Sequence, residues 1–197
     1  MLIDTHVHLD SFPDCEIPLI LDRAHSVGVG FVICAGTTVE SSARAVDISR
    51  RFNSFFAGVG VHPMDIVKPL TGEDYMELRN LAIKEEKVVV MSEIGLDYME
   101  GMPDRAWQFS AFREQINIAR ELDLPIIFHS RGAHQDCFRV LKEEKGYEVG
   151  GVMHYFQGTI KEANEIIDLG FYISIARPIF RLPHLQEVVS ELSLIHI

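Results

Sequence analysis

Short apolar runs alternate along this chain with longer amphipathic segments. The apolar runs are dense in Val, Ile and Phe and do not alternate strictly with polar residues. That pattern is typical of strands buried on both faces, as in a parallel sheet. We predict seven such strands, at residues 1–5, 30–35, 55–61, 87–93, 125–129, 150–154 and 170–175.

The segments between these runs carry helical patterns. Phe109, Phe112, Ile116 and Ala119 recur three or four residues apart, which places them on one face of a helix. Asp104 suits the start of that helix. We predict further helices at residues 17–27, 39–52, 73–84, 133–145, 160–169 and 182–192.

Strands that alternate with helices indicate an α/β protein. Two arrangements fit, a doubly wound sheet and a (β/α)₈ barrel. A complete barrel typically takes about 250 residues and closes with an eighth strand. In a barrel, this chain of 197 residues would lack about one strand and one helix. No linker, repeat or low-complexity segment divides it, so we expect one domain.

Composition restricts the class of protein. Hydrophobic residues make up 47% of the chain and charged residues 24%, as in a soluble globular protein with a core. No apolar stretch reaches the length of a membrane span, and the N-terminus does not resemble a signal peptide. The 3 cysteines are scattered, which favours reduced thiols in the cytoplasm over disulfides or a zinc-thiolate site.

The formal net charge of −11 disfavours broad nucleic-acid binding, because affinity for phosphates comes from Lys and Arg. A nucleic acid would have to be held over a few nucleotides, with bound cations supplying much of the positive charge.

Polar residues stand where the predicted strands end. The carboxyl ends of barrel strands meet at one mouth, where the active sites of that fold lie. The residues concerned are His6 and His8 after the first strand, His62 after the third, Glu93 at the fourth, His129 at the fifth and His154 at the sixth.

This set predicts a metal site. His6 and His8 are two apart on an extended segment, so both can face one cation. Glu93 can bridge that cation to a second one, held by His129 and His154. Two such cations clamp the attacking and leaving oxygens of a phosphoester displacement and acidify a water between them. Nitrogen and oxygen ligands suit Zn, Mn, Co or Mg.

Four further residues are candidate substrate contacts. Arg131 can hold a phosphate through two parallel hydrogen bonds, or can form an ion pair with Asp136 or another carboxylate. His62 either contacts substrate or stabilises its loop. Asp97 and Tyr98 follow Glu93 and either contact substrate or cap the loop.

Several segments resemble the TatD family of metal-dependent hydrolases, within the wider amidohydrolase-like barrels. The resemblance runs from Leu2 to about Leu192. The matching stretches are Asp4-Thr5-His6-Val7-His8-Leu9-Asp10, Gly60-Val61-His62-Pro63, Ser92-Glu93-Ile94-Gly95-Leu96-Asp97-Tyr98, Pro125-Ile126-Ile127-Phe128-His129-Ser130-Arg131 and His154-Tyr155-Phe156-Gln157-Gly158.

The resemblance implies a TIM-like barrel with two divalent cations, and 3′–5′ DNA exonuclease action by a metal-activated water. It assigns catalysis to Glu93, His129 and His154. The substrates implied are DNA ends or small phosphoesters. We expect a monomer in the cytoplasm, without membrane association.

One departure concerns the C-terminus. The family carries a further metal-binding Asp on the eighth strand, in a Glu-Thr-Asp motif before a Pro, and this chain has no such motif. We therefore expect a hydrolase barrel over residues 1–192, incomplete because its last strand and helix are missing, followed by a foreign tail at 193–197. Such a chain would have low activity and an aggregation-prone open edge.

Three alternatives stay open. The first is another hydrolase on the same barrel, acting on amides, lactones or phosphotriesters. Those relatives often bridge their metals with a carboxylated Lys, whereas Glu93 stands here and Lys87 lies at the wrong end of its strand. The second is the polymerase-and-histidinol-phosphatase type, which begins with the same His-x-His. The third is an inactive metal-binding fragment.

Overall fold

Seven strands and seven α-helices alternate in the computed structural model, which describes residues 1–193 and 197. The strands are β1 (Leu2–Val7), β2 (Val29–Ala35), β3 (Phe55–Val59), β4 (Val88–Asp97), β5 (Ile126–Arg131), β6 (Gly151–Met153) and β7 (Phe171–Ile173). The helices are α1 (Ile17–Ser26), α2 (Val39–Arg51), α3 (Gly72–Lys84), α4 (Arg105–Glu121), α5 (His134–Glu143), α6 (Ile160–Asp168) and α7 (Pro183–Glu191). Each predicted strand and helix is confirmed, with ends that shift by a few residues.

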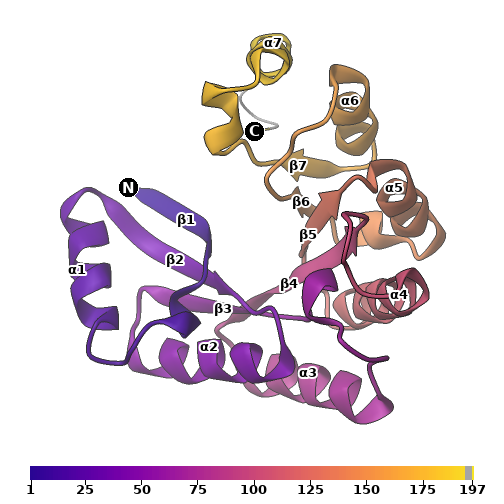
Figure 1. Cartoon of the computed structure of the whole chain (residues 1–197). Coiled ribbons are helices and arrows are strands. Elements are labelled where there is room, and N and C mark those ends of the chain that lie inside the picture. Colours follow the sequence, from indigo (N-terminus) through magenta and orange to yellow (C-terminus); the bar gives the residue numbers. More distant parts are fainter. Residues whose placement is uncertain (194–196) are drawn as a thin grey trace.

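The seven strands form one parallel sheet in the order β1-β2-β3-β4-β5-β6-β7. Consecutive order is that of a (β/α) barrel and differs from the reversing order of a doubly wound sheet. Figure 1 shows the strands curving into an open arch with the helices outside it. The α/β prediction is therefore confirmed, and the chain builds a half-barrel.

The two ends of the arch are β1 and β7, and no pairing joins them among the described residues. Leu2 and Ile3 on β1 keep 64% and 54% of their surface exposed, although β1 is apolar enough for a buried strand. The predicted loss of the last strand and helix by truncation stays a prediction. The predicted foreign tail at 193–197 falls mainly on residues 194–196, which lie outside the described residues.

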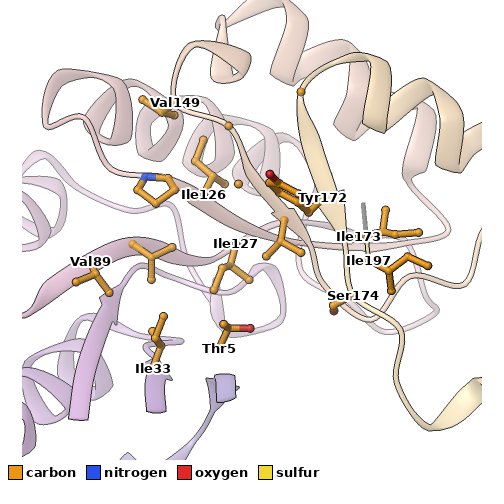
Figure 2. A pocket seen from close by; sticks show the side chains of 16 residues that line it. Thr5, Ile33, Val89, Ile126, Ile127, Val149, Tyr172, Ile173, Ser174 and Ile197 are labelled. Atoms are coloured by element: carbon orange, nitrogen blue, oxygen red, sulfur yellow. The ribbon is translucent and has the colours of Figure 1, made fainter. Parts of the chain in front are cut away.

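A cavity of about 560 Å³ lies on the concave side of the sheet. Figure 2 shows its apolar lining, to which strands from both halves of the arch contribute Ile33, Val89, Ile127 and Ile173. Such inward side chains would form the interior layers of a closed barrel. Here the space between them stays open.

Four of the seven α-helices (α2, α3, α4 and α6) begin after a residue whose side chain replaces missing backbone partners. Asp104 accepts hydrogen bonds from two backbone N–H groups at the start of α4, as its position predicted. Thr159 and Glu162 form a reciprocal capping box on α6. Phe112 and Ile116 of α4 are fully buried against the sheet. The apolar helix face therefore packs on β4 and fixes the strand that carries Glu93.

Among the described residues, no helix is long and apolar enough to cross a membrane. The predicted monomeric state and cytoplasmic location stay predictions. The three cysteines are free, and Cys34 and Cys137 are buried.

Candidate metal centre

The carboxyl ends of β1, β4 and β5 bring polar side chains together at one mouth of the arch. His6 lies near the end of β1, Glu93 lies within β4 and His129 lies within β5. His154 follows β6 directly, and its backbone N–H donates to the Phe128 carbonyl of β5. The predicted gathering of these side chains is what the structure shows.

One group of donor atoms consists of His6, His8 and Glu93. The Nε2 atoms of His6 and His8 lie 3.1 Å apart, and His6 Nε2 lies 3.2 Å from Glu93 Oε2. These three ligand atoms lie within 4.8 Å of one another. His8 Nδ1 lies 3.0 Å from the Ala35 carbonyl, which fixes its proton there and leaves the Nε2 lone pair facing His6.

The chemistry of this group fits a cation. Two imidazole nitrogens and a carboxylate crowd one point, and His6 Nδ1 is buried without a hydrogen bond to any described residue. The ring of His6 stacks on that of His154, with centroids 3.6 Å apart and an interplanar angle of 9°. This stack places a nitrogen-bearing ring from the end of β6 directly beside the first group of donor atoms.

A second group surrounds the other carboxylate oxygen. His129 Nδ1 lies 3.5 Å from Glu93 Oε1. His62 Nε2 lies 3.9 Å from the same oxygen, and one ligand atom from each of these three residues lies within 4.8 Å of the other two. One carboxylate therefore faces both groups, which is the position of a bridging ligand.

His62 carries a hydrogen-bond pattern that restricts its role. The Met64 backbone N–H donates to His62 Nδ1 at 3.1 Å. In a neutral ring the proton then sits on Nε2, the atom that faces Glu93. A protonated nitrogen donates hydrogen bonds and does not ligate a metal. This pattern argues against a place for His62 among the ligands and shows the loop-stabilising bond that was one of its two predicted roles. The predicted substrate contact of His62 stays a prediction.

Asp97 fixes the tautomer of His129, with the proton on Nε2 and the lone pair on Nδ1. Asp97 Oδ2 lies 2.9 Å from His129 Nε2 and accepts a 2.8 Å hydrogen bond from Arg131 Nε. Its Oδ1 accepts from the Met99 backbone N–H at 3.0 Å. A carboxylate on Nε2 keeps the proton there and directs the Nδ1 lone pair toward Glu93. Asp97 thus orients His129 from behind.

Burial and neighbouring groups shift the pKa values of the site residues. Burial raises the pKa of Glu93, but the interactions with the neighbouring His129 and His6 rings outweigh it and hold the pKa well below its usual value. Burial lowers the pKa of His62 and of His154, in each case to about 4. Near neutral pH the site therefore offers an ionised Glu93 carboxylate and a neutral His154 imidazole, the forms that bind cations.

Gly95 allows β4 and β5 to meet closely beside the donors. Its φ is +142°, and a Cβ atom there would lie 2.0 Å from the His129 carbonyl oxygen. Because no side chain fits in that space, glycine lets both strands bring their functional residues to the same point.

Two buried glutamines on α4 support the site, and the sequence reading did not find them. Gln108 accepts from the Asp97 backbone N–H at 2.8 Å and donates to its carbonyl at 3.0 Å. Gln115 does the same for Val61, at 2.6 Å and 3.2 Å. Each glutamine replaces a missing backbone partner at a strand end. The available signal was a pair of polar residues seven positions apart on the apolar face of a helix.

A pocket of about 370 Å³ opens beside the donors. Arg131 and Tyr155 contribute to its wall, together with His62, Met64, Glu93, His129, Ser130, His154 and Gln157. Tyr98 lies elsewhere, since its hydroxyl donates to Asp136 at 2.6 Å and its ring packs under the Arg105 guanidinium. Arg131 pairs with Asp97 and not with Asp136. The predicted substrate contacts of Asp97 and Tyr98 stay predictions.

The comparisons with known proteins agree with this geometry. The family model described as TatD related DNase matches residues 3–197. The metal-dependent hydrolase YabD of Bacillus subtilis is 36% identical over 91% of this chain and 70% of its own length. The 3'-5' ssDNA/RNA exonuclease TatD of Cronobacter sakazakii is 36% identical over 79% of this chain and 59% of its own length.

A solved structure of a TatD homologue has the same fold. The crystal structure of YjjV, a TatD homologue from Escherichia coli, superposes with a TM-score of 0.91 at 31% identity, covering 99% of this chain and 76% of that one. The chain spans about two thirds of the length of the curated relatives it matches, for example 66% of Escherichia coli YcfH. The chain belongs to the TatD-related DNase family.

Proposed function

We propose that this chain forms the metal site of a hydrolase that removes nucleotides from DNA ends by cleaving phosphodiester bonds. The observation that carries the proposal is the position of Glu93, whose two carboxylate oxygens face two separate groups of donor atoms. The names of similar proteins support the proposal: YabD is called a metal-dependent hydrolase, and TatD of Cronobacter sakazakii is called a 3'-5' ssDNA/RNA exonuclease.

Each donor group has a proposed role. His6, His8 and Glu93 would hold one divalent cation. Glu93 and His129 would hold a second, together with His154, whose ring stacks on that of His6 beside them. When bound, such cations supply positive charge that lowers the pKa of a coordinated water and offsets charge on the phosphate. Glu93 contributes as a permanent anion, because its pKa lies well below the usual range.

Arg131 would hold the substrate phosphate. Its Nε donates to Asp97 Oδ2 at 2.8 Å, and its terminal Nη2 lies 2.8 Å from the same oxygen and near the thioethers of Met64 and Met102. Asp97 therefore fixes one edge of the guanidinium, and the remaining N–H groups can donate to a phosphate oxygen. Arg131 also lines the pocket beside the donors, where a phosphate must lie to be cleaved.

The carboxylated-lysine alternative finds no support at β4. Lys87 Nζ donates to the Ser49 and Phe52 carbonyls, both at 2.7 Å, at the opposite end of the strand. Glu93 supplies the bridging carboxylate itself. This placement favours Glu93 over a carboxylated lysine as the bridging ligand.

The test is the shortening of a 5′-labelled single-stranded oligonucleotide with Mg²⁺ or Mn²⁺. We expect stepwise loss from the 3′ end, abolished by chelation and by His129→Ala. His25→Ala is a matched control, because His25 is an exposed histidine of α1 away from the site. Absence of metal-dependent shortening by the wild-type chain, or equal shortening by His129→Ala, would refute the proposal.

A further inference from the structure

Tyr155 has an unusual backbone. It follows β6 directly, next to His154, and its φ is +54°, in the left-handed region. The two other non-glycine residues with positive φ among the described ones are Asp123 and Lys145. A bulky aromatic residue seldom adopts this conformation, because its Cβ crowds the following carbonyl oxygen. Such a conformation persists only where the surroundings enforce it.

The surroundings of Tyr155 do enforce it. Its backbone N–H donates to Ser174 Oγ at 3.0 Å, and the N–H of Phe156 donates to the Ser174 carbonyl at 2.9 Å. The N–H of His154 is bonded to β5, and Phe156 is buried with 1% of its surface exposed. Tyr155 is therefore held between two fixed neighbours, and its side chain is turned away from the core that Phe156 enters.

The ring of Tyr155 lies at the candidate metal pocket. It keeps 37% of its surface exposed, so the core does not use it. It lines the same pocket as His129 and Arg131, and its centroid lies 5.9 Å from that of His154. Met64 lines this pocket too, and its thioether packs favourably against planar rings.

We propose that Tyr155 is a stacking surface for the nucleobase of the nucleotide whose phosphate lies at the metal site. This inference rests on the proposed function. A phosphate held by Arg131 and the cations leaves its base one sugar away, and the exposed phenol ring of Tyr155 lines the same pocket beside His154. Stacking on a single ring favours unpaired bases over a duplex and accepts any base, since every base has a flat face.

The test measures base binding without turnover. A phosphorothioate-linked dinucleotide carrying 2-aminopurine resists cleavage, and its fluorescence falls when the base stacks on an aromatic ring. We expect quenching by the wild-type chain with Mg²⁺, retained by Tyr155→Phe. Tyr155→Asn should remove the quenching and weaken binding roughly tenfold. Asparagine tolerates positive φ, so this variant should keep the wild-type melting temperature.

Tyr147→Asn is the matched control. Tyr147 is 44% exposed but precedes β6, at the other end of the strands. The Tyr147→Asn variant should bind the dinucleotide and quench its fluorescence as the wild type does. Equal quenching by Tyr155→Asn and wild type, or no quenching by the wild type, overturns the inference. Failure of the proposed function shows separately, as the absence of metal-dependent oligonucleotide shortening by the wild type.

Discussion

Asp97→Asn tests how the structure prepares His129 to bind a cation. The substitution keeps the size of the side chain and removes its charge. The carboxylate has three partners, His129 Nε2 and Arg131 Nε on one oxygen and the Met99 N–H on the other. An amide cannot accept from both sides. Either the NH₂ group faces His129 and Arg131, or it faces the Met99 N–H, so at least one interaction is lost in either orientation.

The loss should reach the metal through His129. If the amide NH₂ faces His129 Nε2, the proton moves to Nδ1, the atom that points at Glu93. Loss of such a supporting carboxylate typically lowers metal affinity about 10- to 100-fold. An unpaired buried group should also reduce the free energy of unfolding by about 1–3 kcal/mol.

Calorimetric titration of the metal-free chain with Mn²⁺ measures the first effect, and urea unfolding measures the second. Asp136→Asn is the control. It also removes a paired carboxylate, bonded to Tyr98 and Arg139 at 2.6 Å each, but outside both donor groups. Metal affinity of Asp97→Asn within twofold of wild type, in a folded protein, would refute the role of Asp97.

Three further predictions follow from the same contacts. Burial lowers the pKa of His62 and of His154 to about 4. Because the unfolded values lie near 6.5, stability is present above pH 6.5 and is lost as the pH falls toward 4. Urea unfolding of the metal-free chain at pH 7 and pH 5 should show a loss of up to about 2 kcal/mol per histidine, and an unchanged midpoint would contradict this. Gly95→Ala places a Cβ 2.0 Å from a backbone oxygen and should cost about 2–5 kcal/mol in unfolding. Gly101→Ala, also at positive φ but with nothing within 4 Å, should cost only about 1–2 kcal/mol, and equal losses would count against the close approach of β4 and β5. Gln115→Leu leaves a backbone N–H and C=O unpaired and should cost about 1–3 kcal/mol by urea unfolding, whereas a neutral result would show that water replaces the amide.

Much of the fold could be predicted because it depends on local pattern. Buried apolar runs gave the seven strands, and residues such as Phe112 and Ile116 gave the buried face of α4. The fourth strand was predicted to end at residue 93 but continues to Asp97. It continues because Gly95 and the residues after it pair with β5, a contact between distant segments that local hydrophobicity does not record.

The sequence predicted which residues gather at the candidate site, but it did not predict how their side chains are oriented. The shared ends of parallel strands were enough to bring His6, Glu93 and His129 together. The nitrogen by which each histidine faces the site depends on tertiary hydrogen bonds, such as that of Asp97 to His129. The support from Gln115 likewise becomes visible only when α4 lies against the sheet.

The central claim is that Glu93 joins two groups of metal ligands. Its most direct test is the metal content of the purified chain after dialysis against Mn²⁺ and then metal-free buffer. We predict more than one equivalent of Mn²⁺ for the wild type and a loss of both sites in Glu93→Gln, since the amide cannot serve as an anionic bridge. Equal metal content in the wild type and in folded Glu93→Gln would contradict the account.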